Sequence, residues 1–163
     1  MTKVNINYDM LIYLDKDSTS TVALNKMEEE FGSVGQAQIM IKDISFEEAK
    51  NVESKLESIK GIASVVFTEN VKDTEYFVLN TGSEDTGSAL YKVFLTTGNY
   101  DVESYDTVDE IRNILISYRD SGHAIGTVAL NGGAVESKFL TETLDSDTVS
   151  YTHLRAHETL ANL

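Results

Sequence analysis

The segment from Gln36 to Phe67 constrains the fold most, because it reads as a strand, a helix and a strand joined by short turns. At its start, Ala37, Ile39 and Ile41 alternate with polar or longer side chains, which is the period-two pattern of a half-buried strand. We therefore expect a strand from about Ala37 to Ile44, with one face in a core.

A helix is expected directly after this strand. Ser45 and Glu48 form a capping-box pattern, in which the serine hydroxyl accepts a hydrogen bond from an amide of the first turn. Gly61 stands where a left-handed residue is wanted after a helix, and the β-branched run behind it predicts a second strand. The apolar stripe expected on this helix comprises Phe46, Ala49, Val52 or Glu53, Leu56 and Ile59.

A second unit of the same kind is expected between Ser88 and Val135. Its first strand, SALYKVFLTT, alternates in the same way, and Asp101 or Ser104 is expected to cap a helix that ends near Arg119. The apolar stripe of that helix is formed by Tyr105, Val108, Ile111, Leu115 and Tyr118.

Two such units predict an α+β fold of the ferredoxin-like type, a split βαβ pair with the order βαββαβ. Right-handed crossovers interleave the four strands into one antiparallel sheet with both helices on one face. The fourth strand is expected near Ala124 to Leu130, and an exit helix at Val135 to Leu144, within a domain at residues 36–148. Residues Tyr76 to Leu79 can add a short extra strand between the units.

The residues before this domain are expected to form an extended arm at 1–18 and a leading helix at 19–35. Apolar and polar residues alternate in the arm, and Ser18, Thr19 or Ser20 can cap the helix. This helix is expected to run to about residue 31, where Gly32 and Gly35 follow, and its apolar face comprises Ala23, Leu24, Met27 and Phe31.

Composition excludes several functional classes. A chain of 163 residues can bury a core without disulfides or metals, and cysteine is absent. The net charge of −14 repels the phosphates of nucleic acids, so no nucleic-acid partner is expected. No apolar run approaches the roughly 20 residues that span a bilayer, and no signal-peptide pattern follows Met1. The fragment is therefore expected to be soluble.

Carboxylate clusters are the first candidates for a functional site. They lie at Glu28 to Glu30 and at Glu47 with Glu48, where they could serve in acid–base chemistry or bind a cation. Solvated helix faces and favourable charges in a first helical turn explain such clusters better. We therefore expect no catalytic carboxylate here.

The other candidates are equally weak. His123 follows a serine and a glycine in a predicted turn and has no partner histidine or cysteine for catalysis or metal binding. Gly126, Gly132 and Gly133 form no phosphate-binding pattern and are interpreted as a bulge and a turn, and Lys138 belongs to no P-loop. No serine lies in a nucleophile elbow. We expect no catalytic, cofactor-binding or metal-binding residue, and no enzyme.

The last part of the chain differs from the rest. The run VSYTHLRAHET, Val149 to Thr159, resembles the translation of a transposase-type sequencing-library adapter. This resemblance implies that native sequence stops near Thr148 and that residues 149–163 are a non-native tail. His153 and His157, four residues apart, could offer two metal ligands on a helix, but the resemblance removes them from consideration.

The beginning of the chain resembles the first large exterior loop of MMPL-type transporters of the resistance, nodulation and division (RND) superfamily. The resemblance is carried by NYDMLIYLDKDSTS and MEEEFG, although Asp15 stands where proline is usual in the family. The residues at the family's tyrosine–aspartate, tyrosine–leucine and phenylalanine–glycine positions are Tyr8 and Asp9, Tyr13 and Leu14, and Phe31 and Gly32.

The resemblance extends downstream over nearly all of Val4 to Asp147. The runs that follow the family's order are KGIASV from Lys60, SALYKVFL from Ser88, DEIR from Asp109 and GGAVESKFL from Gly132. Their order and spacing carry the resemblance, since each run alone is unspecific.

This resemblance implies a porter-like domain on the exterior face of the cell membrane, between the first and second membrane helices of a proton-driven exporter. Both helices are then missing from the chain. The implied partners are the remaining membrane helices, a second exterior domain of the same transporter and a hydrophobic or amphiphilic substrate. Full-length protein could form a homo-oligomer. The proton-relay carboxylates of such exporters lie in the membrane helices. Substrate-facing residues are not identified by sequence.

Two other functions stay open. A stand-alone sensor domain that binds a small ligand can have the same βαββαβ architecture, although this is an argument from fold alone. An exterior domain of a protein-export accessory factor from the same superfamily is the third possibility.

Overall fold

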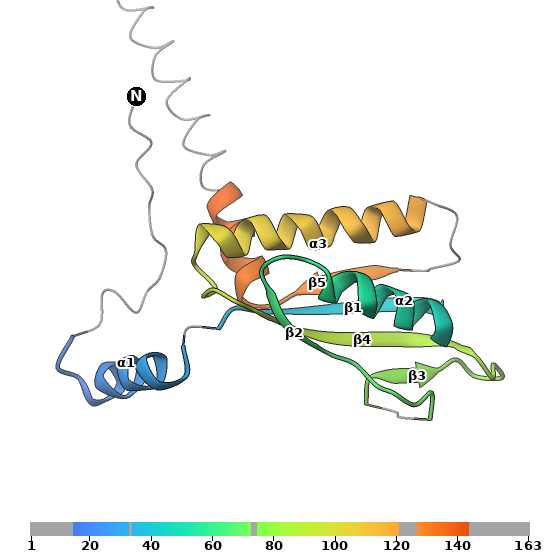
Figure 1. Cartoon of the computed structure of the whole chain (residues 1–163), viewed down its shortest axis with the longest axis horizontal. Helices are drawn as coiled ribbons and strands as arrows, with labels where there is room; N and C mark the ends of the chain where they lie inside the picture. Colours follow the sequence, from blue (N-terminus) through green and yellow to red (C-terminus); the bar gives the residue numbers. More distant parts are fainter. Residues whose placement is uncertain (1–14, 33, 73–74, 121–126, 144–163) are drawn as a thin grey trace, which may run out of the picture.

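The computed structural model describes residues 15–32, 34–72, 75–120 and 127–143 (Figure 1). Residues 1–14 of the arm predicted at 1–18, His123 and the tail at 149–163 lie outside these residues. A helix at residues 133–143 follows the last strand. The labelled elements are α1 (Thr19–Phe31), β1 (Gln36–Ser45), α2 (Phe46–Glu57), β2 (Ile62–Val66), β3 (Phe77–Leu79), β4 (Thr86–Leu95), α3 (Val102–Asp120) and β5 (Val128–Asn131).

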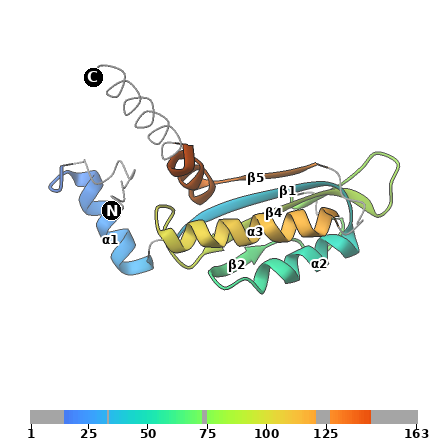
Figure 2. The same ribbon diagram turned by 90° about the horizontal axis from the view of Figure 1, so that it is seen from above.

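The sheet confirms the predicted α+β, ferredoxin-like arrangement. Its strands follow the order β2-β4-β1-β5, and each neighbouring pair is antiparallel. Helices α2 and α3 lie together on one face of the sheet (Figures 1 and 2). Within the described residues the sheet has five strands and not four. The fifth is β3, which pairs with β4 beyond the end of β2 and matches the extra strand expected near residues 76–79.

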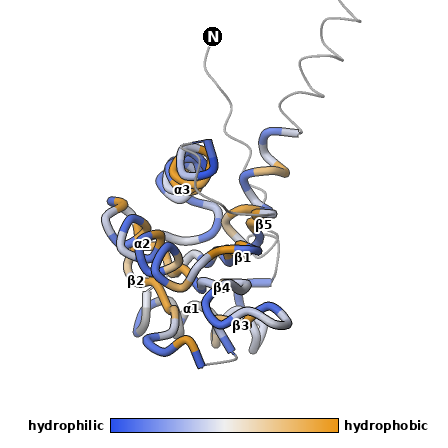
Figure 3. The backbone as a smooth tube through the Cα atoms, turned by 90° about the vertical axis from the view of Figure 1, so that its right-hand side faces the viewer, coloured by the Kyte–Doolittle hydropathy of each residue, from blue (hydrophilic) through white to orange (hydrophobic). Residues whose placement is uncertain are grey.

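The core lies between the sheet and the two helices. Along β4 buried residues alternate with half-buried ones, and Ala89, Tyr91, Val93 and Leu95 face the helices. Hydrophobic residues also lie on α2, α3 and β1 (Figure 3). A register shift between Ile41 and Ile44 interrupts the pairing of β1 with β4. Both of these isoleucines are fully buried.

Helix α2 begins as predicted but ends earlier than Gly61 suggests. The Ser45 hydroxyl accepts a hydrogen bond from the Glu48 amide at 3.2 Å. The helix ends at Glu57 with Ser58 as its C-cap, so Gly61 lies in the following turn with φ +113°. A Cβ there would collide with the Thr107 hydroxyl, which gives this glycine a second reason to be small.

Helix α3 follows a turn that two predicted capping side chains stabilise. The Asp101 carboxylate accepts a hydrogen bond from the Gly98 amide at 2.6 Å, and the buried Ser104 hydroxyl donates to the Gly98 carbonyl at 2.6 Å. These side chains therefore bind the loop before α3 instead of its first free amides. The predicted stripe is confirmed at Val108, Ile111, Leu115 and Tyr118, all of which are buried.

Helix α1 is capped by Ser18, whose hydroxyl accepts a hydrogen bond from the Thr21 amide at 3.2 Å. Ala23, expected on its apolar face, is exposed. Gly32 follows the helix with φ +77°. The predicted fourth strand and exit helix are observed at β5 and at residues 133–143.

Candidate functional site

The carboxylate clusters do not form a site within the described residues. Glu29 and Glu30 are exposed on α1. Glu47 and Glu48 lie in the first turn of α2, and the Glu48 carboxylate accepts a hydrogen bond from the Ser45 hydroxyl at 3.3 Å. In the part of the chain that the structure describes, no three histidine, cysteine or acidic side chains come together as a possible metal site.

The candidate histidines and Gly126 lie outside the described residues. Gly132 has the turn role that the sequence predicts, whereas Gly133 begins helix 133–143. Gly132 has φ +120°, and a Cβ on it would lie 2.6 Å from the Gln36 carbonyl oxygen. A Cβ on Gly133 would meet the Asn99 side chain at 2.6 Å. Gly132 therefore lets the end of β5 pass closely beside the beginning of β1, and Gly133 leaves room for the Asn99 side chain.

Lys138 lies in an ion-pair network that sequence analysis missed. Its side chain is 9% exposed, and Nζ lies 2.8 Å from Oδ2 of Asp109 and 2.9 Å from Oε1 of Glu142. Desolvation lowers the pKa of Lys138, but the two carboxylates outweigh it, so the pKa is raised above its usual value. Lys138 is therefore a charged anchor and not a nucleophilic amine.

Arg112 joins the same network from α3. Its Nη1 lies 3.8 Å from Asp109 Oδ1 and 3.9 Å from Glu142 Oε2. Because Asp109 is on α3 while Lys138 and Glu142 are on helix 133–143, the network fastens this helix to α3.

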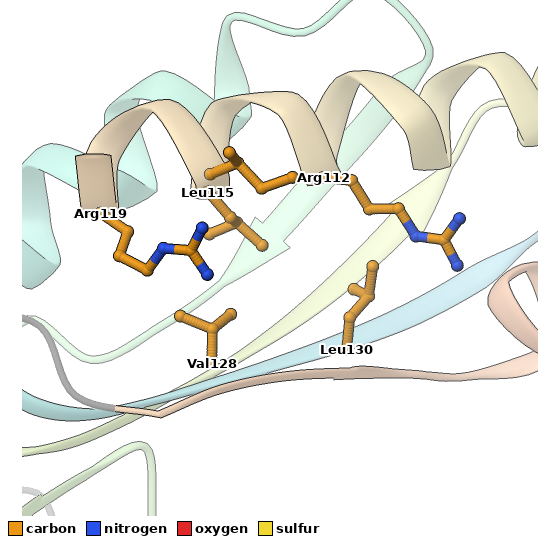
Figure 4. Close-up of a pocket in the computed structure, with 6 residues that line it drawn as sticks. Arg112, Leu115, Arg119, Val128 and Leu130 are labelled. Carbon is orange, nitrogen blue, oxygen red and sulfur yellow. The ribbon is translucent and has the colours of Figure 1, made fainter. Parts of the chain in front are cut away.

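Beside this network, a groove of about 200 Å³ runs between α3 and β5. Arg112 and Arg119 lie toward opposite ends of it, and apolar side chains of both elements lie between them (Figure 4). Its lining residues are Arg112, Leu115, Ile116, Arg119, Val128 and Leu130. We call it the α3–β5 groove.

The chemistry of the α3–β5 groove is that of binding. Its lining contains no nucleophile and no general base, since it consists of arginine and aliphatic side chains. Guanidinium groups bind carboxylates with two parallel hydrogen bonds, and the aliphatic floor takes apolar groups. The ion pair between Arg119 Nε and Asp120 Oδ1, at 3.1 Å, joins two largely exposed side chains. Such pairs are weak, so Arg119 can accept another anion.

The sequence alone does not indicate this groove. The available signal was the spacing of Arg112 and Arg119, which lie seven residues apart on one helical face in a chain with far more acidic than basic residues. This spacing does not show that β5 lies beneath that face of the helix.

A scan against models of protein families and a search of curated proteins find no match for this chain. Among the described residues, no helix is long and apolar enough to span a bilayer.

Proposed function

We propose that this chain is the exterior, porter-like domain of an MMPL-type, proton-driven exporter of the RND superfamily. Its substrate is then hydrophobic or amphiphilic. The family resemblance supports this function, because its motifs occur in the family's order from Tyr8 to Gly132 and beyond. The α+β fold with both main helices on one face is compatible with such a domain.

The observation that carries the proposal is the position of the two points where the chain enters and leaves the sheet. Gln38, near the start of β1, pairs with Asn131 at the end of β5. Helices α1 and 133–143 extend from this same end of the sheet (Figures 1 and 2). A domain inserted between two neighbouring membrane helices needs this arrangement, because both connections return to one membrane surface.

In the proposed exporter the domain is a rigid part of the substrate path and performs no chemistry. Its partners are the membrane helices and a second exterior domain. Proton movement belongs to carboxylates within the membrane helices, where burial couples their protonation to conformation. The packed core between the sheet and its two helices suits a rigid role.

The flanking genomic reading frame tests this proposal. An apolar segment of roughly 20 residues is expected upstream of Val4, and a second one downstream of Asp147. Two such segments would support an insertion between membrane helices. Polar flanking sequence on both sides would contradict it.

A small-ligand sensor domain is the second candidate, and the α3–β5 groove favours it. This function predicts a stable dimer that binds a small metabolite. Thermal unfolding of the chain across a panel of amino acids and carboxylates tests it, with Arg119→Gln as the control for groove binding. A monomer without any thermal shift would exclude this candidate.

A further inference from the structure

The free edge of β5 coincides with the α3–β5 groove. In the described part of the chain β5 ends the sheet, and it pairs with β1 alone. The Lys42 amide donates to the Thr127 carbonyl at 3.0 Å, which fixes the alternation of hydrogen bonds between these strands. In an antiparallel ladder every second residue faces the neighbouring strand. The amides and carbonyls of Val128 and Leu130 therefore face away from β1.

The side chains of these same two residues form the floor of the groove. Val128 and Leu130 pair with Ile41 and Ile39, both buried, so they lie on the face of the sheet that carries α3. A strand added beside β5 would thus form backbone hydrogen bonds with Val128 and Leu130, and every second side chain would enter the groove.

The two arginines specify the chemistry of such a strand. The ion-pair distances from Arg112 to Asp109 and Glu142, 3.8 and 3.9 Å, are too long for hydrogen bonds, so its N–H groups can still donate to a further carboxylate. They lie seven positions apart on α3, which corresponds to about 10 Å along the helix axis. Side chains on one face of a strand are spaced by about 7 Å per two residues, so the first and fifth residues lie about 13 Å apart. Flexible arginine side chains can cover this small difference. Carboxylates at those two positions and an apolar residue between them match the groove.

We propose that the α3–β5 groove binds an extended peptide segment. Acidic, apolar and acidic side chains stand at alternate residues of this segment, and the segment adds to the sheet as a strand beside β5. A second copy of this chain fits less well, because each copy carries a net charge of −14 and would place like-charged arginines together at a symmetric contact. This inference stands on the groove and does not depend on the transporter proposal.

The probe is a capped peptide, Ser-Asp-Thr-Val-Thr-Asp-Ser, titrated into the nitrogen-15-labelled full chain and followed by NMR. We expect the largest amide shifts at Val128 and Leu130, with further shifts at the side-chain Nε–H groups of Arg112 and Arg119. No shift at roughly 1 mM peptide, the weak end of measurable affinity, would overturn the proposal. So would shifts confined to another surface.

Three matched probes separate the contributions. Replacing both aspartates of the peptide by lysine should weaken binding by about tenfold or more, because charge-assisted hydrogen bonds are lost. Methylation of the central valine amide should weaken it similarly, because a backbone donor to β5 is lost. Decanedioate carries two carboxylates on an apolar chain without a peptide backbone. If it binds as tightly as the peptide, or if methylation has no effect, the groove is a small-anion site and strand addition is wrong.

Variants of the chain test the same contacts from the other side. Arg119→Gln should weaken peptide binding by about tenfold, whereas Lys72→Gln should leave it unchanged. Lys72 is an exposed matched control that lies beyond β2, at the opposite edge of the sheet. Leu130→Pro removes one outward amide and should abolish binding, with the amide spectrum as the check of folding. Unchanged affinity in Arg119→Gln would contradict the proposal.

Discussion

The β2 and β3 edge of the sheet is packed by aromatic rings, whereas the helix that continues from the β5 edge is fastened by charged side chains. Phe46 lies 5.2 Å from Phe77, and Phe67 stacks on Tyr91 at 4.6 Å between ring centroids. At the other edge, Lys138 pairs with carboxylates on two helices. Ring packing between Phe46, Phe67, Phe77 and Tyr91 stabilises the first edge. The second edge has the α3–β5 groove, which is lined by Arg112 and Arg119, and among the described residues its strand β5 pairs with β1 alone.

The largest expected effect is at the aromatic edge. Phe77 is fully buried, and its ring contacts Phe46 and Phe67 edge to face. Phe77→Ala should lower the free energy of unfolding by about 3–5 kcal/mol, because transfer free energy is lost and a cavity remains. Urea denaturation measures this change.

Phe139→Ala on helix 133–143 is the matched control, since its ring is 64% exposed. It should change stability by no more than about 0.5 kcal/mol. Equal losses in the two variants would show that the aromatic edge has no special part in stability.

An intermediate effect is expected at the charged edge. Lys138→Met preserves much of the side-chain volume but leaves Asp109 and Glu142 without their closest cation. Because these carboxylates are about half exposed, the expected loss is about 1–2 kcal/mol, below that of a fully buried pair. Hydrogen exchange should increase in helix 133–143 and leave α2 unchanged.

The pH dependence of this effect follows from the raised pKa of Lys138. The folded state holds the proton more tightly than the unfolded chain, whose lysine titrates near pH 10.5. The stability difference between the original chain and Lys138→Met should therefore be constant below pH 10.5 and decrease above it. A difference that grows with pH would mean that the lysine is not held in its charged form.

The smallest effect is expected for Tyr91→Phe at the aromatic edge. The Tyr91 hydroxyl is buried and donates to the Ala49 carbonyl at 2.8 Å. Its loss should cost about 1 kcal/mol in urea denaturation. Burial raises the pKa of Tyr91, with smaller contributions from Glu53 and Tyr118.

The sign of this pKa shift predicts a high-pH signature. Protonated Tyr91 stabilises the fold fully below the ordinary tyrosine pKa of 10.0, and this contribution is lost as pH rises above it. The original chain should lose stability more steeply than Tyr91→Phe above pH 10.0. Parallel pH profiles would indicate that solvent reaches the hydroxyl.

Local sequence patterns predicted most of the fold because each element carries its own periodicity. The alternation on β4 and the stripe on α3 are local signals, and both are confirmed by burial. The position of Gly61 predicted the end of α2 two residues too late. The Ser58 hydroxyl donates to the Lys55 carbonyl at 2.6 Å, and the Ser58 amide donates within the same turn, to the carbonyls of Lys55 and Leu56. These bonds end the helix before Gly61.

The groove and its network depend on contacts between distant residues, which explains why the sequence did not predict them. Lys138 pairs with Asp109, which lies 29 positions earlier in the chain. Leu130 lines the groove together with Arg112 because β5 pairs with β1. Lysine in an amphipathic helix is normally solvent-exposed, so nothing local marked Lys138 as buried. The sequence also carries no sign of the positive φ of Asp43, which lies in the register shift between Ile41 and Ile44.

Amide hydrogen exchange at low and high salt tests the contrast between the two edges most directly. Raising salt from about 0.01 M to 1 M shortens the screening length from roughly 30 to 3 Å, which weakens ion pairs and leaves ring packing intact. We predict that the amides of helix 133–143 lose protection at high salt while those of α2 and β4 keep theirs. Equal responses at both edges, or a loss of protection only in α2 and β4, would contradict this account.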